Sequence, residues 1–185
     1  AQKYGSLEKG LKDAAEQTAK LAGSTEGLRS LLDNSRARGQ WGERMAEDIL
    51  RASGLQEGIQ YKKNRALDTS TVRPDFTFLL PDSKKLNMDV KFPLDNWLRL
   101  AHATNDDDKL RFKKEFEKDV KARIKEVTSR GYVSPEEGTL DYVLLFIPNE
   151  QVYAYIQEAF PGLGDEALGQ KVVLCSPFTL YAVLG

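Results

Sequence analysis

Residues 73–97 read RPDFTFLLPDSKKLNMDVKFPLDNW, and this stretch decides the fold. Two segments in which apolar and polar residues alternate flank the triplet Pro81-Asp82-Ser83. Alternation with a period of two is typical of a half-buried strand, and Pro, Asp and Ser favour turns. The stretch therefore predicts a hairpin of two strands, over residues 72–80 and 85–92.

The apolar positions of the two strands set how this hairpin pairs. Alternate side chains of a strand share a face, so one face carries six apolar residues: Phe76, Phe78, Leu80, Leu86, Met88 and Val90. Facing residue numbers must then sum to an even number, because a slip by one residue would turn one apolar set toward solvent. In that register Asp75 lies near Asp89 or Lys91.

The rest of the chain predicts a mixed sheet covered by helices. Further strands are expected over residues 60–66, 140–147 and 172–175, and the second of these is a nearly all-apolar run typical of a strand buried on both faces. Helices are expected from about Gly39 to Ala52, over 106–129 with Asn105 as the cap, from Pro148-Asn149 to residue 159, and over 177–184. This order of elements predicts the α/β class, with a mixed sheet flanked by helices.

Residues 4–36 predict a separate N-terminal helix. Its seam positions recur at alternating spacings of four and three, as in a heptad repeat: Leu7, Leu11, Ala14, Thr18, Leu21, Thr25, Leu28 and Leu32. We expect residues 1–36 to be the end of a coiled coil, through which the chain would form a homo-oligomer, and residues 37–185 to be the α/β domain. A helix folded back onto that domain is the alternative.

Composition limits the chemistry that this chain can perform. Its 185 residues are 41% hydrophobic and 30% charged, which is typical of one soluble globular domain. The one cysteine, Cys175, excludes an internal disulfide, and the one histidine, His102, argues against a zinc site or a histidine-centred triad. Carboxylates and lysines remain, with hydroxyl groups as a further option, and this set suits an ion with oxygen ligands such as Mg²⁺.

Positive charge gathers before residue 131. Residues 1–130 contain 26 Lys and Arg against 21 Asp and Glu, whereas residues 131–185 contain one basic residue and seven acidic ones. A polyanion would therefore meet the first part of the chain. No apolar run approaches the length of a membrane span and no signal peptide is evident, so no membrane contact is expected of this fragment.

Two carboxylates and a lysine converge on the polar side of the predicted hairpin. Asp75 and Asp89 repel each other at close range unless a cation lies between them. Glu43 and Glu47 of the preceding helix are four residues apart and share a helix face directed at the edge of the sheet. The alternative is structural: Asp75 caps a strand end, Asp89 and Lys91 form a surface ion pair, and the glutamates are solvated or paired with arginines.

Four ordered segments carry a resemblance to a known family: 39–55 (GQWGERMAEDILRASGL), 73–97, 138–150 (GTLDYVLLFIPNE) and 171–184 (KVVLCSPFTLYAVL). Pro74-Asp75 followed by Asp89-Val90-Lys91 on a hairpin, after a Gly-Glu helix, resembles the PD-(D/E)XK nuclease superfamily. Within it the chain is most similar to the RmuC family of bacterial DNA recombination proteins, over roughly residues 39–184. The resemblance implies a restriction-endonuclease-like mixed sheet. Its usual small residue between the aspartate and the lysine is a valine in this chain.

The resemblance implies five catalytic residues: Asp75, Asp89, Lys91, Glu43 and Glu47. The two aspartates would hold Mg²⁺ or Mn²⁺, with the Val90 carbonyl oxygen as a further ligand. Glu43 would complete the set of ligands directly or through water, and Glu47 is less favoured for this role. The lysine would orient or help to deprotonate the attacking water and stabilise charge on the phosphate.

Members of the family are typically longer than this chain, with an N-terminal membrane anchor, a coiled coil and further C-terminal helices. The chain starts at Ala1 rather than Met, and it stops just after the helix over 177–184 begins. We therefore expect a cytoplasmic fragment that is truncated at its C-terminus. The resemblance implies that the full-length protein can be anchored to the membrane at its N-terminus.

Two clusters of basic residues are candidates for nucleic-acid binding. One lies just before Asp75 and comprises Lys62, Lys63, Arg65 and Arg73. The other forms a stripe along the helix over 106–129 and comprises Lys114, Lys118, Lys121 and Lys125. Such clusters contact phosphates without reading bases, although nearby acidic residues leave an ordinary solvated helix face as the alternative for the stripe.

These residues, together with the resemblance, imply a magnesium-dependent DNA nuclease that acts in recombination or repair. The alternative is a catalytically inactive DNA-binding or scaffolding module built on a nuclease fold. RNA as the substrate stays open.

Overall fold

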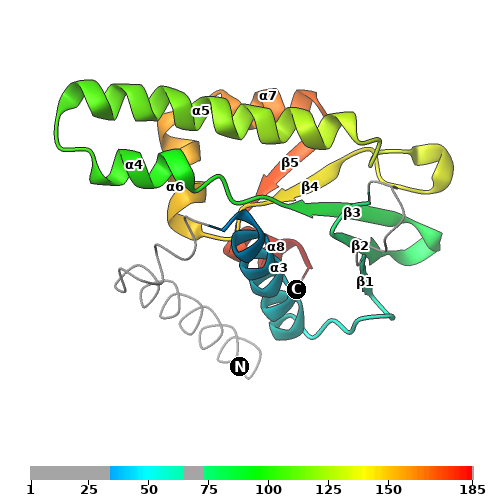
Figure 1. Cartoon of the computed structure of the whole chain (residues 1–185). Coiled ribbons are helices and arrows are strands. Elements are labelled where there is room, and N and C mark those ends of the chain that lie inside the picture. The colour runs from blue at the N-terminus through cyan, green and yellow to red at the C-terminus, as the bar shows by residue number, and fades with distance from the viewer. Residues whose placement is uncertain (1–33, 65–72, 185) are drawn as a thin grey trace.

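The computed structural model describes residues 34–64 and 73–184, which form an α/β domain around one five-stranded sheet (Figure 1). The strands lie in the sheet in chain order: β1 (Tyr61–Lys63), β2 (Phe76–Leu79), β3 (Lys85–Val90), β4 (Val143–Phe146) and β5 (Val172–Cys175). The helices are α3 (Ser35–Ala52), α4 (Asp95–His102), α5 (Asp106–Ser129), α6 (Glu150–Ala159), α7 (Leu163–Gly169) and α8 (Pro177–Leu184). Two 3₁₀ turns, η1 (Pro81–Ser83) and η2 (Pro135–Glu137), precede β3 and β4. The predicted α/β class with a mixed sheet flanked by helices is confirmed.

The hairpin of β2 and β3 has the predicted even register. Phe76 lies opposite Met88, and Phe78 lies opposite Leu86. β2 is antiparallel to both β1 and β3, whereas β4 runs parallel to both β3 and β5. Parallel neighbours need crossover connections. Here α4 and α5 lie between β3 and β4 in the chain, and α6 and α7 lie between β4 and β5.

Helices cover both faces of the sheet and create two hydrophobic cores. On one face α3 and α8 pack over the apolar side of the hairpin, where Phe76, Phe78 and Met88 are buried beside Leu50 and Leu180. On the other face α5, α6 and α7 pack over β4 and β5. All four residues of β4 are buried, as expected of a strand that is covered on both faces.

Within the described residues β1 to β4 are shorter than their apolar patterns indicate, and the sequence patterns do not predict α4 or α7. Strand pairing needs a neighbouring backbone, so periodicity along one segment does not set where the ladder ends. Single backbone hydrogen bonds continue just past β3 and β4, from the Lys91 N–H to the Phe146 carbonyl at 3.0 Å and from the Ile147 N–H to the Cys175 carbonyl at 2.8 Å. α4 forms because Leu94 and Leu98 are buried against Trp41 and Phe92. α7 has a glycine at its second and last positions, which is typical of a loop in sequence, yet Leu163 and Ala167 are buried in the core.

α3 begins at Ser35, before the predicted start near Gly39. The Asn34 Oδ1 caps it by accepting hydrogen bonds from the N–H groups of Arg36 and Ala37, at 3.0 and 3.2 Å. The expected boundary between residues 36 and 37 therefore falls inside the first turn of α3. The heptad positions 7–32, and with them the predicted coiled coil and homo-oligomer, lie outside the described residues.

α5 has the predicted bounds and the predicted cap. The Asn105 Oδ1 accepts a hydrogen bond from the Asp108 N–H at 2.8 Å, and three aspartates in the first turn complement the helix dipole. The buried side of the helix, which includes Phe116 and Ile124, rests on the sheet. Neither α5 nor any other helix of the described ranges is both long and apolar enough to cross a membrane.

Gly42 lies where α3 packs tightly against β3. A Cβ atom at this position would lie 2.9 Å from the Val90 Cγ1 and 3.2 Å from the Pro148 Cγ. Gly42→Ala should therefore destabilise the domain, by about 1–3 kcal/mol, because the added carbon overpacks the contact. Urea unfolding measures the change in the free energy of unfolding.

Gly39→Ala is the matched control in the same helix, because nothing lies within 4 Å of a Cβ atom at that position. A helical Gly→Ala change in open space stabilises by roughly 0.5–1 kcal/mol, so the two substitutions should have opposite signs. Equal stabilisation by both would contradict the tight packing of α3 on Val90.

Candidate active site

Asp89 is a buried carboxylate near the end of β3. The residue has no exposed surface, and its side chain lies on the sheet face that α5 covers. Its Oδ2 lies 3.0 Å from the Lys91 Nζ and 3.4 Å from the Arg130 Nη1. Its Oδ1 is buried and has no hydrogen-bond partner within the part of the chain that the structure describes. One oxygen is therefore neutralised by two cations, and the other has unused capacity to accept.

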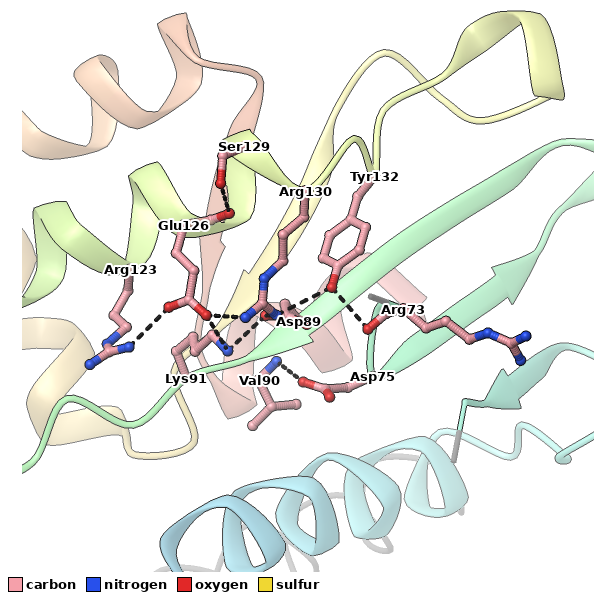
Figure 2. A network of polar contacts seen from close by, with 10 residues as sticks. All are labelled: Arg73, Asp75, Asp89, Val90, Lys91, Arg123, Glu126, Ser129, Arg130 and Tyr132. Atoms are coloured by element: carbon pink, nitrogen blue, oxygen red, sulfur yellow. Dashed lines mark hydrogen bonds and ion pairs between the residues drawn. The ribbon is translucent and has the colours of Figure 1, made fainter. Parts of the chain in front are cut away.

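Asp75 lies one residue before β2, in the row of the hairpin register that faces Asp89. Its Oδ2 accepts a hydrogen bond from the Val90 N–H at 2.7 Å (Figure 2). Burial is the largest influence and, with the charges of Asp89 and Glu43, raises the pKa of the Asp75 carboxyl to about 7, against the bond from Val90 and the charge of Lys91. The two aspartates therefore repel each other in the way that the hairpin register predicts.

Lys91 is held between two carboxylates. Its Nζ lies 3.0 Å from the Asp89 Oδ2 and 3.5 Å from the Glu126 Oε1 of α5. Its backbone N–H donates to the Phe146 carbonyl of β4 at 3.0 Å, which fixes the chain just after β3. Only 19% of the side chain is exposed, so the ammonium is confined to this cluster.

Three residues of this cluster are missed by sequence reasoning: Glu126, Arg130 and Tyr132. Arg130 forms an ion pair with Glu126, and its Nη1 lies 3.3 Å from the Tyr132 Oη (Figure 2). The Tyr132 hydroxyl in turn donates to the Arg73 carbonyl at 2.8 Å. The one visible sequence signal is the spacing of four between Glu126 and Arg130, which is common on solvated helices.

Glu126 stays ionised within this cluster. Burial is the largest influence and favours the neutral form, but the Lys91 ammonium and the guanidinium groups of Arg123 and Arg130 together lower the pKa of its carboxyl. Arg123 lies 2.9 Å from the Glu126 Oε2. The end of α5 thus places alternating charges directly beside Asp89.

Glu43 and Glu47 share the face of α3 that the sequence predicts, and Lys63 lies against both. The Lys63 Nζ is 3.6 Å from the Glu43 Oε2 and 3.1 Å from the Glu47 Oε2. Lys63 is therefore engaged with α3. Of the two glutamates, Glu43 acts on Asp75, because its charge contributes to the raised pKa of that carboxyl.

A divalent ion fits part of this arrangement. The buried Oδ1 of Asp89 and the adjacent Asp75 carboxyl offer oxygen ligands, and a cation would relieve the repulsion between the two aspartates. Within residues 34–64 and 73–184, no three His, Cys, Asp or Glu side chains lie close enough to hold an ion together. A metal site at this place would take its ligands from the two aspartates, and a third carboxylate would have to come from Glu43.

The basic residues predicted to bind nucleic acid differ in their exposure and in their ion pairs. Lys62 and Arg73 are exposed beside the hairpin, whereas Arg65 lies outside the described residues. On α5, Lys114 and Lys125 are exposed. The two others in the stripe are paired with acidic side chains: Lys118 with Glu115 at 3.1 Å, and Lys121 with Glu117 at 3.0 Å and Glu166 at 3.8 Å. These pairs weaken the stripe as a surface for a polyanion.

The sheet and this cluster define an α/β protein with a buried group of acidic and basic side chains at the end of a central strand. A sequence model of the RmuC family matches residues 1–185, and the chain belongs to that family.

Several curated proteins are similar to the chain. It is 31% identical to the DNA recombination protein RmuC of Escherichia coli K12, over all of this chain and 40% of that protein. It is 30% identical to RmuC homologues of Neisseria meningitidis serogroup A, over 96% of this chain and 32% of that protein, and of Pseudomonas aeruginosa, over 97% and 40%. The chain thus spans well under half the length of these relatives. No solved structure matches it significantly.

The raised pKa of Asp75 predicts that the domain loses stability as pH rises. Burial, together with the nearby charges of Asp89 and Glu43, raises the pKa of this carboxyl from 3.8 to about 7, so between these values the folded protein holds a proton that the unfolded chain has released. An excess of bound protons in the folded state means that the free energy of unfolding falls with rising pH, until the folded pKa is passed. Urea unfolding in EDTA, from about pH 4 to about pH 8, measures this change.

Asp75→Asn isolates the effect, since it removes the titration and keeps an oxygen that accepts from the Val90 N–H. The difference in the free energy of unfolding between wild type and variant should shift by roughly 2–4 kcal/mol across this window, in favour of the variant at high pH. Asp82→Asn makes the same chemical change at an exposed residue of η1 and should show no such shift. Parallel pH profiles for wild type and Asp75→Asn would contradict the raised pKa.

Proposed function

We propose that the chain is part of a magnesium-dependent DNA nuclease that acts in recombination. The observation that carries this proposal is the pair of adjacent aspartates, Asp75 and Asp89, with Lys91 held beside the second. The curated relatives are named DNA recombination proteins, which supports a DNA substrate and a role in recombination. In this proposal the sheet is restriction-endonuclease-like, and the domain works in the cytoplasm on bacterial DNA.

Asp75 and Asp89 would hold Mg²⁺ or Mn²⁺, with the Val90 carbonyl oxygen as a further ligand. Glu43 would add a ligand directly or through water, because its charge already acts on Asp75. Glu47 is less suited, since its closest charged partner is Lys63. A bound divalent ion supplies polarisation of the phosphodiester and a lower pKa for a bound water.

Lys91 is the residue of this chain that would meet the phosphate. Its ammonium is held by Asp89 and Glu126, so it is positioned before substrate arrives. From that place it would orient the attacking water and stabilise the negative charge that develops on the phosphate. Arg130, 3.4 Å from the Asp89 Oδ2, would compensate the buried charge of that carboxylate.

The alternative function is a catalytically inactive DNA-binding or scaffolding module on a nuclease fold. It is favoured by the two cations on Asp89, because Lys91 and Arg130 compensate the buried charge without an ion. DNA binding would then need no metal, and RNA is a second possible ligand for either function.

A DNA-cleavage assay distinguishes the proposed nuclease from the inactive DNA-binding module. The purified chain should cleave linear, nicked or branched DNA in Mg²⁺ or Mn²⁺, and Asp89→Asn or Lys91→Ala should reduce the rate by about 100-fold or more. Asp82→Asn, in η1 of the same hairpin, is the control for the loss of a carboxylate and should leave the rate unchanged. Activity that survives both site substitutions would belong to a contaminant, and RNA of the same sequence tests the sugar preference.

Metal binding is measured directly by calorimetry. Wild type should bind Mn²⁺, and Asp75→Asn should weaken that binding by at least about tenfold, because it removes a charged ligand. Asp82→Asn should bind as wild type does. No heat of binding with wild type, together with intact DNA binding, would favour the inactive module.

A further inference from the structure

A polar groove of about 470 Å³ runs over β1, β2 and β3 beside the candidate active site. Its walls and floor include six polar or basic residues: Lys62, Asn64, Arg73, Thr77, Lys85 and Asn87. The lining also contains one carboxylate, that of Glu137. A volume of this size lies within the range of about 300–1,000 Å³ that is usual for small-ligand sites. The groove therefore accommodates a short stretch of single-stranded nucleic acid rather than a duplex.

The floor of the groove is on the same sheet face as Asp89. Lys62 lies opposite Thr77, and Thr77 lies opposite Asn87. Asn87 and Asp89 are two residues apart on β3, so their side chains share a face and their rows are about 6.8 Å apart. A nucleic-acid strand lying along the floor would therefore reach Asp75 and Asp89 at the next row of side chains on this face.

The floor is rigid because its polar groups bond to one another. The Asn64 Nδ2 donates to the Thr77 Oγ1 at 2.9 Å, and that hydroxyl donates to the Asn87 Oδ1 at 2.8 Å. The Asn87 Nδ2 then donates to the Tyr132 carbonyl at 2.8 Å. Tyr132 also contacts Arg130 beside Asp89, so one chain of hydrogen bonds joins the groove to the site.

The groove's cations have no acidic partner within ion-pair distance among the described residues. Lys62, Arg73 and Lys85 are all exposed. Lys63, by contrast, is taken up by Glu43 and Glu47 of α3. Elsewhere on this sheet face, over β4 and β5, α5 to α7 pack on an apolar surface. The open part of the face is thus polar and positive, which is the character of a surface that meets phosphates.

We propose that this polar groove binds the sugar–phosphate backbone of one nucleic-acid strand and leads it to Asp75 and Asp89. The cations would contact the phosphates and the hydrogen-bonded floor would support the strand, without reading its sequence. This inference deepens the proposed nuclease function and rests on it for the link to cleavage. The binding step needs no metal and can be tested separately.

The test measures binding of a fluorescent single-stranded DNA by anisotropy in EDTA, as a function of salt concentration. The double variant Lys62→Ala/Lys85→Ala should weaken binding by about tenfold and reduce the slope of log K against log salt by about 0.7 for each lost phosphate contact. Lys62→Arg/Lys85→Arg should restore both, because it keeps the charges. A purely structural role would not change the salt slope.

Two variants with the same loss of charge serve as controls. Arg99→Ala/Lys109→Ala lies at the α4–α5 end of the molecule, away from β1 and β2 (Figure 1), and should bind as wild type does. Lys114→Ala/Lys125→Ala tests the rival surface on α5. An equal effect of either pair, or no effect of the groove pair, would overturn the proposal.

Two further titrations identify the ligand. RNA of the same sequence should lose affinity in the groove variant as DNA does, and a loss confined to one sugar would overturn the assignment to the backbone. An acidic peptide that binds as tightly as DNA of equal charge would overturn the nucleic-acid assignment in favour of a protein partner.

Failure of the groove is distinguishable from failure of the proposed nuclease. Cleavage that depends on Asp89, combined with unaltered binding by Lys62→Ala/Lys85→Ala, would contradict nucleic-acid binding by the groove and support the proposed nuclease function. DNA binding that depends on the groove, without cleavage by wild type in any metal, would support the groove as a binding site and contradict the proposed nuclease function.

Discussion

A fully buried carboxylate is the constraint around which much of this domain is arranged. An ionised group such as that of Asp89 would cost several kcal/mol if it were left without compensation. Lys91 and Arg130 supply positive charge at 3.0 and 3.4 Å. Lys91 follows β3 and Arg130 follows α5, so the need to compensate one charge ties the crossover helix to the sheet. Glu126 then balances both cations.

The register of the β2–β3 hairpin is a second constraint on the fold, because it decides which side chains share a face of the sheet. With Phe76 opposite Met88, the apolar set faces α3 and α8 while Asn87 and Asp89 face the opposite side. A slip by one residue would either bury these polar groups under α3 or turn Phe76 to the opposite face of the sheet. The same register puts the candidate site and the polar groove on one face, so the fold and the proposed chemistry depend on a single choice of pairing.

Local periodicity was sufficient to predict the elements whose stability is itself local. α5 has its predicted bounds because Asn105 caps it and its apolar face repeats with the helical period. β5 also has its predicted bounds, although its ladder is with β4, which is distant in the chain. α4 and α7 were not predictable in this way. Each is short, and each is stabilised by buried contacts with residues far away in the chain, as Leu98 is by Trp41.

The residues of the candidate site also fall into two groups, those predicted from local sequence and those brought together by tertiary packing. Alternation along β2 and β3 and the parity rule were enough to bring Asp75, Asp89 and Lys91 together from sequence, since hairpin partners are close in the chain. Arg130 is 41 residues from Asp89, and no periodic signal relates the two. The folded chain brings them together because α5 must cross the sheet to connect two parallel strands, and its last turn then ends beside β3. Sequence thus determined the pair of carboxylates and their lysine, and tertiary packing determined the cations and the open polar face around them.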